Sequence, residues 1–147
     1  MADAVPVLLG TAGFVLGECF VLGDGSDVVI GRSRSCDISL RRAANYLKAA
    51  SETRDVDQDF NTVSRRHLRL QVHESVVRVQ DLSTNGTFCN DDPVQQAREI
   101  DLANGAFSLR LGTRETFQVQ MLPKDDPRVI VAGAREPQAA GPKTPAP

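Results

Sequence analysis

The sequence is poor in the residues that large cofactor pockets, disulfide frameworks and metal clusters require. Its 147 residues include no tryptophan, one tyrosine and three cysteines. So few large aromatic rings argue against an aromatic-lined pocket for a flat cofactor. Cys19, Cys36 and Cys89 are widely spaced and form no CxxC pair, which argues against a zinc site and favours a reducing compartment. We therefore expect no metal and no cofactor.

A strong charge of one sign and a long hydrophobic run are also lacking. The formal net charge of −2 at pH 7 gives no bulk attraction to nucleic acid, so any bound anion needs a local cluster of donors. No apolar run reaches the length of a membrane span, and the N-terminus lacks the pattern of a signal peptide. These features predict a cytoplasmic protein, or a nuclear one if the source is eukaryotic, with neither nucleic acid nor membrane as partner.

What the sequence does contain is a series of short alternating segments separated by turn residues. Hydrophobic residues make up 41% of the chain, enough for one packed core at this length. Apolar and polar side chains alternate over 36–40, 68–72, 107–111 and 117–121. Half-buried strands produce this pattern because successive side chains leave opposite faces of a strand. Many short strands with regular turns predict an all-β sandwich.

Residues 41–61 break this rhythm. Ala43, Leu47 and Ala50 lie at helical spacing among good helix formers, which predicts about two helical turns. The polar stretch 52–59 that follows is expected to be a solvated loop. The whole segment is longer than the connection that two strands of a compact sandwich need, so we treat it as an insertion.

The composition changes again after residue 122. Proline, alanine and glycine dominate residues 123–147, which predicts a disordered tail. Within it, 129–131 is a short apolar run that could add a weak strand or a docking segment. We expect one domain over 1–122 followed by this tail.

Three short motifs lie where the expected strands begin or end. They are Gly-Arg at 31–32, Ser-Arg-Arg-His at 64–67 and Asp-Leu-Ser-Thr-Asn-Gly-Thr at 81–87. Taken singly, each has a structural explanation as a turn, a basic loop or a tight hairpin. Their joint order and spacing in an all-β chain resembles the forkhead-associated (FHA) domain family, and the resemblance extends from about residue 5 to 122.

The resemblance implies both a fold and a function. The fold would be the SMAD/FHA-like sandwich of two antiparallel sheets, here with a short helical insertion between strands. The function would be recognition of a phosphothreonine peptide, so that the protein recruits a phosphorylated partner in Ser/Thr-kinase signalling and is not an enzyme. The expected partner is a Thr-phosphorylated protein; a Ser/Thr kinase or its substrate is a candidate.

The resemblance also assigns roles in binding the phosphopeptide. Arg32 would offer a guanidinium fork to the phosphate, and Ser64 a short hydrogen bond from its hydroxyl. Arg65 occupies the next position, which contributes a further donor in the family. Thr84 would line the pocket for the phosphothreonine, and Asn85 would hydrogen-bond the main chain of the peptide. All five belong to loops that a rigid scaffold would present.

Four further residues match family positions that support the binding loops. Gly31 would permit close backbone packing before the arginine, and Gly86 would support the turn of the third motif. His67 would hydrogen-bond within the loop framework, and Asn90 would brace the same loops.

The alternatives to peptide recognition are a serine hydrolase and an assembly subunit. Ser64 and His67 lie within one tetrapeptide, but residues three apart on an extended strand point to opposite faces and no orienting carboxylate is identifiable. A hydrolase is therefore not favoured. A structural or assembly subunit with phosphate-independent contacts remains the alternative, although Arg32, Ser64 and Asn85 together argue against it.

The insertion is the largest departure from the family pattern. It immediately precedes the Ser64 loop. The resemblance implies that loops at this end of the domain select the residue around three positions after the phosphothreonine, so the charged residues of the insertion could tune selectivity; the insertion could equally form a lid or bind a second partner. The charged candidates are Arg41, Arg42, Arg54, Asp55, Asp57 and Asp59.

Overall fold

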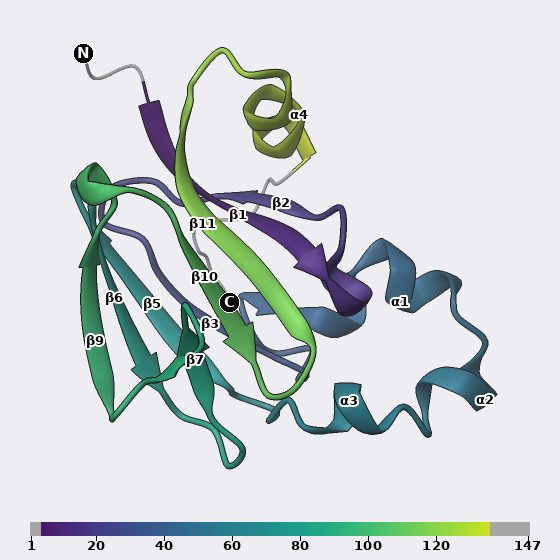
Figure 1. The fold of residues 1–147 in the computed structure, drawn as a ribbon. Helices are drawn as coiled ribbons and strands as arrows, with labels where there is room; N and C mark the ends of the chain where they lie inside the picture. The colour runs from purple at the N-terminus through teal and green to yellow at the C-terminus, as the bar shows by residue number, and fades with distance from the viewer. Residues whose placement is uncertain (1–3, 136–147) are drawn as a thin grey trace.

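A computed structural model describes residues 4–135 of the chain, which form two β-sheets packed face to face (Figure 1). The six-stranded sheet has the order β2 (Cys19–Val21), β1 (Ala4–Ala12), β11 (Glu115–Pro123), β10 (Phe107–Leu111), β7 (Thr87–Cys89) and β8 (Asp92–Pro93). The five-stranded sheet has the order β4 (Ile38–Ser39), β3 (Asp27–Gly31), β5 (Leu68–His73), β6 (Val76–Asp81) and β9 (Ala97–Asp101). The predicted β-sandwich is confirmed.

The period-two patterns explain most of the core between the sheets. Strands β5 and β10 cover the predicted segments, and their alternate apolar side chains are buried. The pattern at 36–40 produces only the two-residue strand β4, because the chain turns into the 3-10 helix η2 (Leu40–Arg42). Strand β4 pairs with β3 in parallel, so the five-stranded sheet is mixed rather than purely antiparallel.

The insertion forms three short helices at one side of the sandwich (Figure 1), which are α1 (Ala44–Lys48), α2 (Ser51–Arg54) and α3 (Gln58–Asn61). Its buried side chains are Ala43, Tyr46 and Phe60, and the rings of Tyr46 and Phe60 both contact Phe14 edge-on. Of the apolar stripe suggested by Ala43, Leu47 and Ala50, only Ala43 is buried, whereas Leu47 is 61% exposed. The helix breaks at Ala50, which has an extended backbone.

A buried carboxylate ties the insertion to the six-stranded sheet. Glu115, at the start of β11, is fully buried and accepts the backbone N–H of Val15 at 3.2 Å. Arg114 donates to the Glu115 carboxylate at 2.9 Å and to Asp57 of the insertion at 3.1 Å. Burial raises the pKa of Glu115, and the hydrogen bonds from Arg114 oppose that shift. The insertion is therefore packed and ion-paired onto the sandwich.

The chain ends differently from the expectation of a tail beginning at residue 123. Residues 127–135 form helix α4 (Pro127–Arg135), which packs against β2 (Figure 1). Val129 is buried in a small cluster with Val7 and Leu122. The apolar run at 129–131 is thus helical and not a strand. The rest of the predicted tail, 136–147, lies outside the described residues.

The described residues also bear on membrane and metal binding. Within 4–135 no helix is long and apolar enough to cross a bilayer. In the same range there is no group of three or more His, Cys, Asp or Glu side chains placed to hold a metal ion.

Candidate functional site

Three loops at one end of the five-stranded sheet bring the motif residues together. Arg32 follows β3, Ser64 and Arg65 precede β5, and Thr84 and Asn85 lie between β6 and β7. Strand β5 is antiparallel to both β3 and β6, so the end of β3, the start of β5 and the end of β6 meet at the same edge. The topology therefore gathers residues that are up to 53 positions apart in sequence.

Backbone hydrogen bonds hold the first two loops against each other. The Arg32 N–H donates to the Ser64 carbonyl at 3.1 Å, and the Ser33 N–H to the Arg65 carbonyl at 3.0 Å. The two chains approach so closely at Gly31 that an added Cβ would lie 2.1 Å from the Arg65 carbonyl oxygen. Only glycine permits this approach, which explains why it precedes the arginine.

The Arg32 side chain is half-buried and oriented by the second loop. Its Nε donates to the Val63 carbonyl oxygen. Its two terminal nitrogens form no hydrogen bond within residues 4–135. Burial, followed by the positive charges of Arg41 and Arg65, lowers the pKa of Arg32, yet a guanidinium stays charged at neutral pH. The structure thus fixes the stem of Arg32 and leaves its charged fork available.

Polar groups of the second and third loops are hydrogen-bonded to each other. The Thr84 N–H donates to the Ser64 Oγ at 3.0 Å, so the Ser64 hydroxyl hydrogen remains available to a ligand. The Asn85 Nδ2 donates to the Thr62 carbonyl at 3.0 Å, which orients the amide. Thr84, Asn85 and Arg65 are exposed.

A buried histidine joins the second loop to the third. His67 is fully buried; its Nδ1 accepts the Ser64 backbone N–H at 3.0 Å, and its Nε2 lies 2.8 Å from the Gly86 carbonyl oxygen. These partners require a neutral ring with the proton on Nε2. Burial lowers the pKa of His67, while the Gly86 carbonyl and Asp81 oppose that shift. Both ring nitrogens are engaged by main-chain groups, so His67 is not placed to act as a base on the Ser64 hydroxyl.

The third loop is organised by residues for which sequence reasoning proposed no role. The Asp81 carboxylate accepts hydrogen bonds from the hydroxyls of Ser83 at 2.6 Å and Thr87 at 2.8 Å. Ser83 Oγ in turn accepts the Gly86 N–H at 2.8 Å, and Gly86 has a positive φ of 105°. The signal was present, because Asp two positions before Ser at a strand end is typical of an Asx-turn.

Asn90 lies apart from these loops, at the other end of β7 from Gly86. Its side-chain oxygen accepts the Ser108 N–H at 2.9 Å, and its own N–H donates to the Ser108 carbonyl at 3.0 Å. Asn90 has a positive φ of 51°, a conformation that Asn tolerates better than most residues. It therefore ties the β7–β8 hairpin to β10 and reaches none of the three loops through these bonds.

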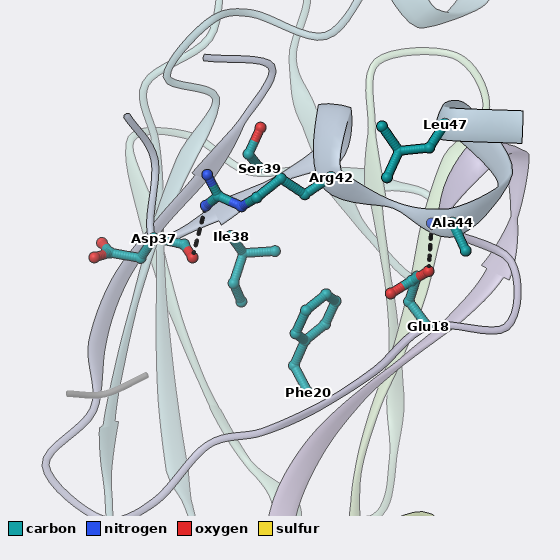
Figure 2. A pocket seen from close by; sticks show the side chains of 8 residues that line it. All are labelled: Glu18, Phe20, Asp37, Ile38, Ser39, Arg42, Ala44 and Leu47. Carbon is teal, nitrogen blue, oxygen red and sulfur yellow. Dashed lines mark hydrogen bonds between the residues drawn. The ribbon is translucent and has the colours of Figure 1, made fainter. Parts of the chain in front are cut away.

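A cavity of about 300 Å³ lies beside the first loop, between β2, β4 and α1 (Figure 2). Arg42 on its wall donates to the carbonyl oxygens of Arg34 and Cys36, each at 2.7 Å. Across the cavity, Glu18 accepts the Ala44 N–H at 2.9 Å. This cavity is the seam where the insertion meets the sandwich, and none of Arg32, Ser64 and Asn85 lines it.

The comparisons with known proteins agree with this geometry. The family model of the FHA domain matches residues 28–112, more than half of the chain. The chain belongs to the FHA family. The matched region contains all three motifs and the whole insertion. FHA domains are generally interaction modules without enzymatic activity. A comparison with curated proteins finds no match.

Solved FHA domains share the fold. One from Arabidopsis thaliana is 22% identical, with a TM-score of 0.61 over 86% of this chain and 92% of that one. One from Chlamydia trachomatis is 20% identical, with a TM-score of 0.58 over 79% of this chain and 96% of that one. A third, from work on phosphothreonine-dependent FHA interactions, is 28% identical, with a TM-score of 0.55 over 81% of this chain and 98% of that one.

Proposed function

We propose that this FHA domain binds a threonine-phosphorylated segment of a partner protein and recruits that partner in Ser/Thr-kinase signalling. The phosphopeptide-binding residues are Arg32, Ser64, Arg65, Thr84 and Asn85. The observation that carries the proposal is the convergence of free donors from three loops whose backbones are hydrogen-bonded to one another. The 28% identical FHA domain from work on phosphothreonine-dependent interactions supports it.

The phosphate is held by charge and by short hydrogen bonds. A phosphothreonine carries about −1.5 to −2 charges at pH 7. The free fork of Arg32 matches two phosphate oxygens, and the Ser64 hydroxyl donates to a third. The exposed guanidinium of Arg65 adds a second positive charge. Because charge-assisted hydrogen bonds are stronger than neutral ones, the unphosphorylated segment binds far more weakly.

The peptide main chain and the threonine methyl group set the register. Asn85 is oriented by the Thr62 carbonyl, so its remaining amide groups hydrogen-bond the main chain of the peptide beside the phosphothreonine. We assign to Thr84, whose N–H donates to the Ser64 Oγ, the side of the site that takes the methyl group. One buried methyl group contributes about 0.8 kcal/mol, so phosphothreonine binds more tightly than phosphoserine.

The same contacts favour recruitment over catalysis. The two ring nitrogens of His67 are taken by the Ser64 N–H and the Gly86 carbonyl. The Ser64 hydroxyl oxygen is occupied by the Thr84 N–H. A serine nucleophile needs a base within hydrogen-bond reach, and this arrangement assigns the histidine to loop support instead.

The test is a titration with a phosphothreonine peptide library beside its unphosphorylated twin. We expect measurable binding only of the phosphorylated library and a loss of at least roughly hundredfold for Arg32→Ala, because several charge-assisted hydrogen bonds disappear. Arg69→Ala is the matched control, since Arg69 is ion-paired with Asp27 on the sheet at 2.6 Å and lies outside the loops. Equal binding of both libraries, or insensitivity to Arg32→Ala, would establish the phosphate-independent assembly role instead.

A further inference from the structure

The first residues of the insertion lie beside the proposed phosphate site. Strand β4 pairs in parallel with β3, so that Ser39 lies opposite Gly31. The Ser39 hydroxyl donates to the Arg32 carbonyl at 3.4 Å and accepts the Arg41 N–H at 3.2 Å. A single side chain therefore connects the backbones of Arg32 and Arg41. The parallel pairing that sequence reasoning did not foresee creates this proximity.

Arg41 brings a third positive charge to the site. Burial lowers the pKa of Arg32, and the positive charges of Arg41 and Arg65 lower it further. Arg41 is half-buried, and its guanidinium forms no hydrogen bond or ion pair within the part of the chain that the structure describes. The insertion acids Asp57 and Asp59 instead face Arg114, at 3.1 and 4.0 Å. Clustered like charges repel each other, and this arrangement becomes favourable when an anion lies among them.

The neighbouring Arg42 differs from Arg41 in the hydrogen bonds of its guanidinium. Arg42 directs its guanidinium to the carbonyl oxygens of Arg34 and Cys36 and closes the cavity wall (Figure 2). These two hydrogen bonds hold the backbone of the first loop in place. Adjacent residues of the same type thus have different roles: Arg42 holds the loop, while Arg41 adds charge beside Arg32.

Charge balance indicates what Arg41 binds. The three guanidinium groups of Arg32, Arg41 and Arg65 carry three positive charges, whereas one phosphothreonine supplies about −1.5 to −2. About one positive charge is left over in a half-buried setting, which one further anionic group would neutralise. The insertion positions that charge firmly, because Tyr46 and Phe60 pack its helices into the core.

We propose that Arg41 is a specificity-determining residue that binds a second anionic group of the ligand, so that the site selects phosphothreonine peptides with a carboxylate or a second phosphate near the phosphothreonine. This inference rests on the proposed function. The insertion would then contribute to the choice of partner through Arg41, its first residue, rather than by closing over the site as a lid.

The experiment uses the full chain and a matched set of phosphothreonine peptides. A neutral parent peptide receives a single Glu, Gln or phosphoserine at each of four positions on either side of the phosphothreonine. We expect the best acidic peptide to bind roughly tenfold more tightly than its Gln twin, as one charge-assisted contact allows. Arg41→Gln abolishes this preference, while binding of the neutral parent changes less than about threefold. The Glu and phosphoserine series show which anion the site takes.

Two control variants separate the role of Arg41 from general electrostatics and from folding. Lys48→Gln removes a positive charge from the exposed end of α1 in the same insertion and is expected to keep the preference. Arg41→Lys keeps the positive charge and is expected to keep part of the preference for acidic peptides. Thermal unfolding of Arg41→Gln is expected at or above the wild-type temperature, because charge repulsion is relieved.

The outcomes distinguish this inference from the function on which it rests. An acidic preference that survives in Arg41→Gln, no preference in the wild type, or an equal loss on the neutral and acidic peptides would each overturn the role of Arg41. In those cases dependence on the phosphate and on Arg32 would still uphold the proposed function. If the unphosphorylated twins bind equally well, the proposed function itself fails.

Discussion

The insertion and the binding loops adjoin in sequence but are held in place by different forces. The insertion is held by side chains, with the rings of Phe14, Tyr46 and Phe60 in contact at centroid distances of 5.0–5.4 Å. The loops are held by main-chain hydrogen bonds, by the close approach at Gly31 and by the buried imidazole of His67. The apolar side chains of the insertion stabilise the fold, while the binding loops leave charged and polar side chains free.

This difference explains how one scaffold can serve both purposes. Loops held mainly through their backbones can present Arg32, Ser64 and Asn85 without using those side chains fully in the fold. The insertion is held through its side chains and contributes to the core, so only those of its side chains that do not pack into the core can bind a ligand. Arg41 is such a position. Substitutions in the two regions should therefore separate stability from peptide affinity.

The largest effect is expected for Phe60→Ala. It removes a buried ring from the insertion core and should lower the free energy of unfolding by about 3–5 kcal/mol, measured by urea denaturation. Peptide affinity of the folded fraction should change little, because the loops keep their own hydrogen bonds. Val56→Ala, at a 70% exposed position, is the control and should be nearly neutral. A strong loss of affinity with little loss of stability would contradict the division of roles.

Gly31→Ala should affect both properties. The new Cβ would lie 2.1 Å from the Arg65 carbonyl, so the first two loops must move apart. We expect a loss of stability of about 1–3 kcal/mol, as for other overpacked sites, together with a clear loss of peptide binding. Gly23→Ala is the matched control because nothing lies within 4 Å of its added Cβ. Equal behaviour of the two variants would show that the loop contact is not tight.

Asn85→Ala should act mainly on affinity. The exposed hydrogen bond to the Thr62 carbonyl contributes at most about 0.5–1.5 kcal/mol to stability. Loss of the contact to the peptide main chain should weaken phosphopeptide binding roughly tenfold, measured by calorimetry. Asn61→Ala, an exposed position of the same residue type on α3, should bind normally. If both variants bind equally, Asn85 does not contact the peptide.

The smallest effect is the pH dependence of stability due to His67. Burial lowers its pKa below the ordinary value of 6.5, so the unfolded chain takes up the proton first as the pH falls. The stability from neutral His67 is complete above about pH 6.5 and is lost as the pH falls from there through the lower folded-state pKa. Urea unfolding between pH 8 and 5 should show this decline. The decline should persist in His73→Gln, which removes the exposed second histidine, and its absence there would contradict the assignment.

Sequence reasoning predicted the fold well where the signal is local. Alternation over 68–72 and 107–111 corresponds to β5 and β10, because burial on one face of a strand leaves a period-two pattern. The three-residue run at 129–131 was too short for periodicity to separate strand from helix. Burial of Val129 and Ala132 at i and i+3 favours the helix observed there.

The motifs predicted a set of binding residues, and the structure shows how their loops are arranged. The three motifs named Arg32, Ser64 and Asn85, and the structure brings their loops to one edge. The motifs did not distinguish Arg41 from Arg42, because only the folded structure shows that the Arg42 guanidinium meets the carbonyl groups of Arg34 and Cys36. Asn90 was placed with the loops, whereas its contacts are with Ser108 of β10.

The family and the strand-rich fold could be predicted from the sequence, because hydrophobic period, turn glycines and short motifs are local properties. Three features are visible only in the folded chain: β4 lies parallel to β3, Tyr46 and Phe60 rather than Leu47 face the core, and Ser39 links the backbones of Arg32 and Arg41. These outcomes depend on contacts between residues far apart along the chain. Such contacts arise from packing across elements, which no local pattern encodes.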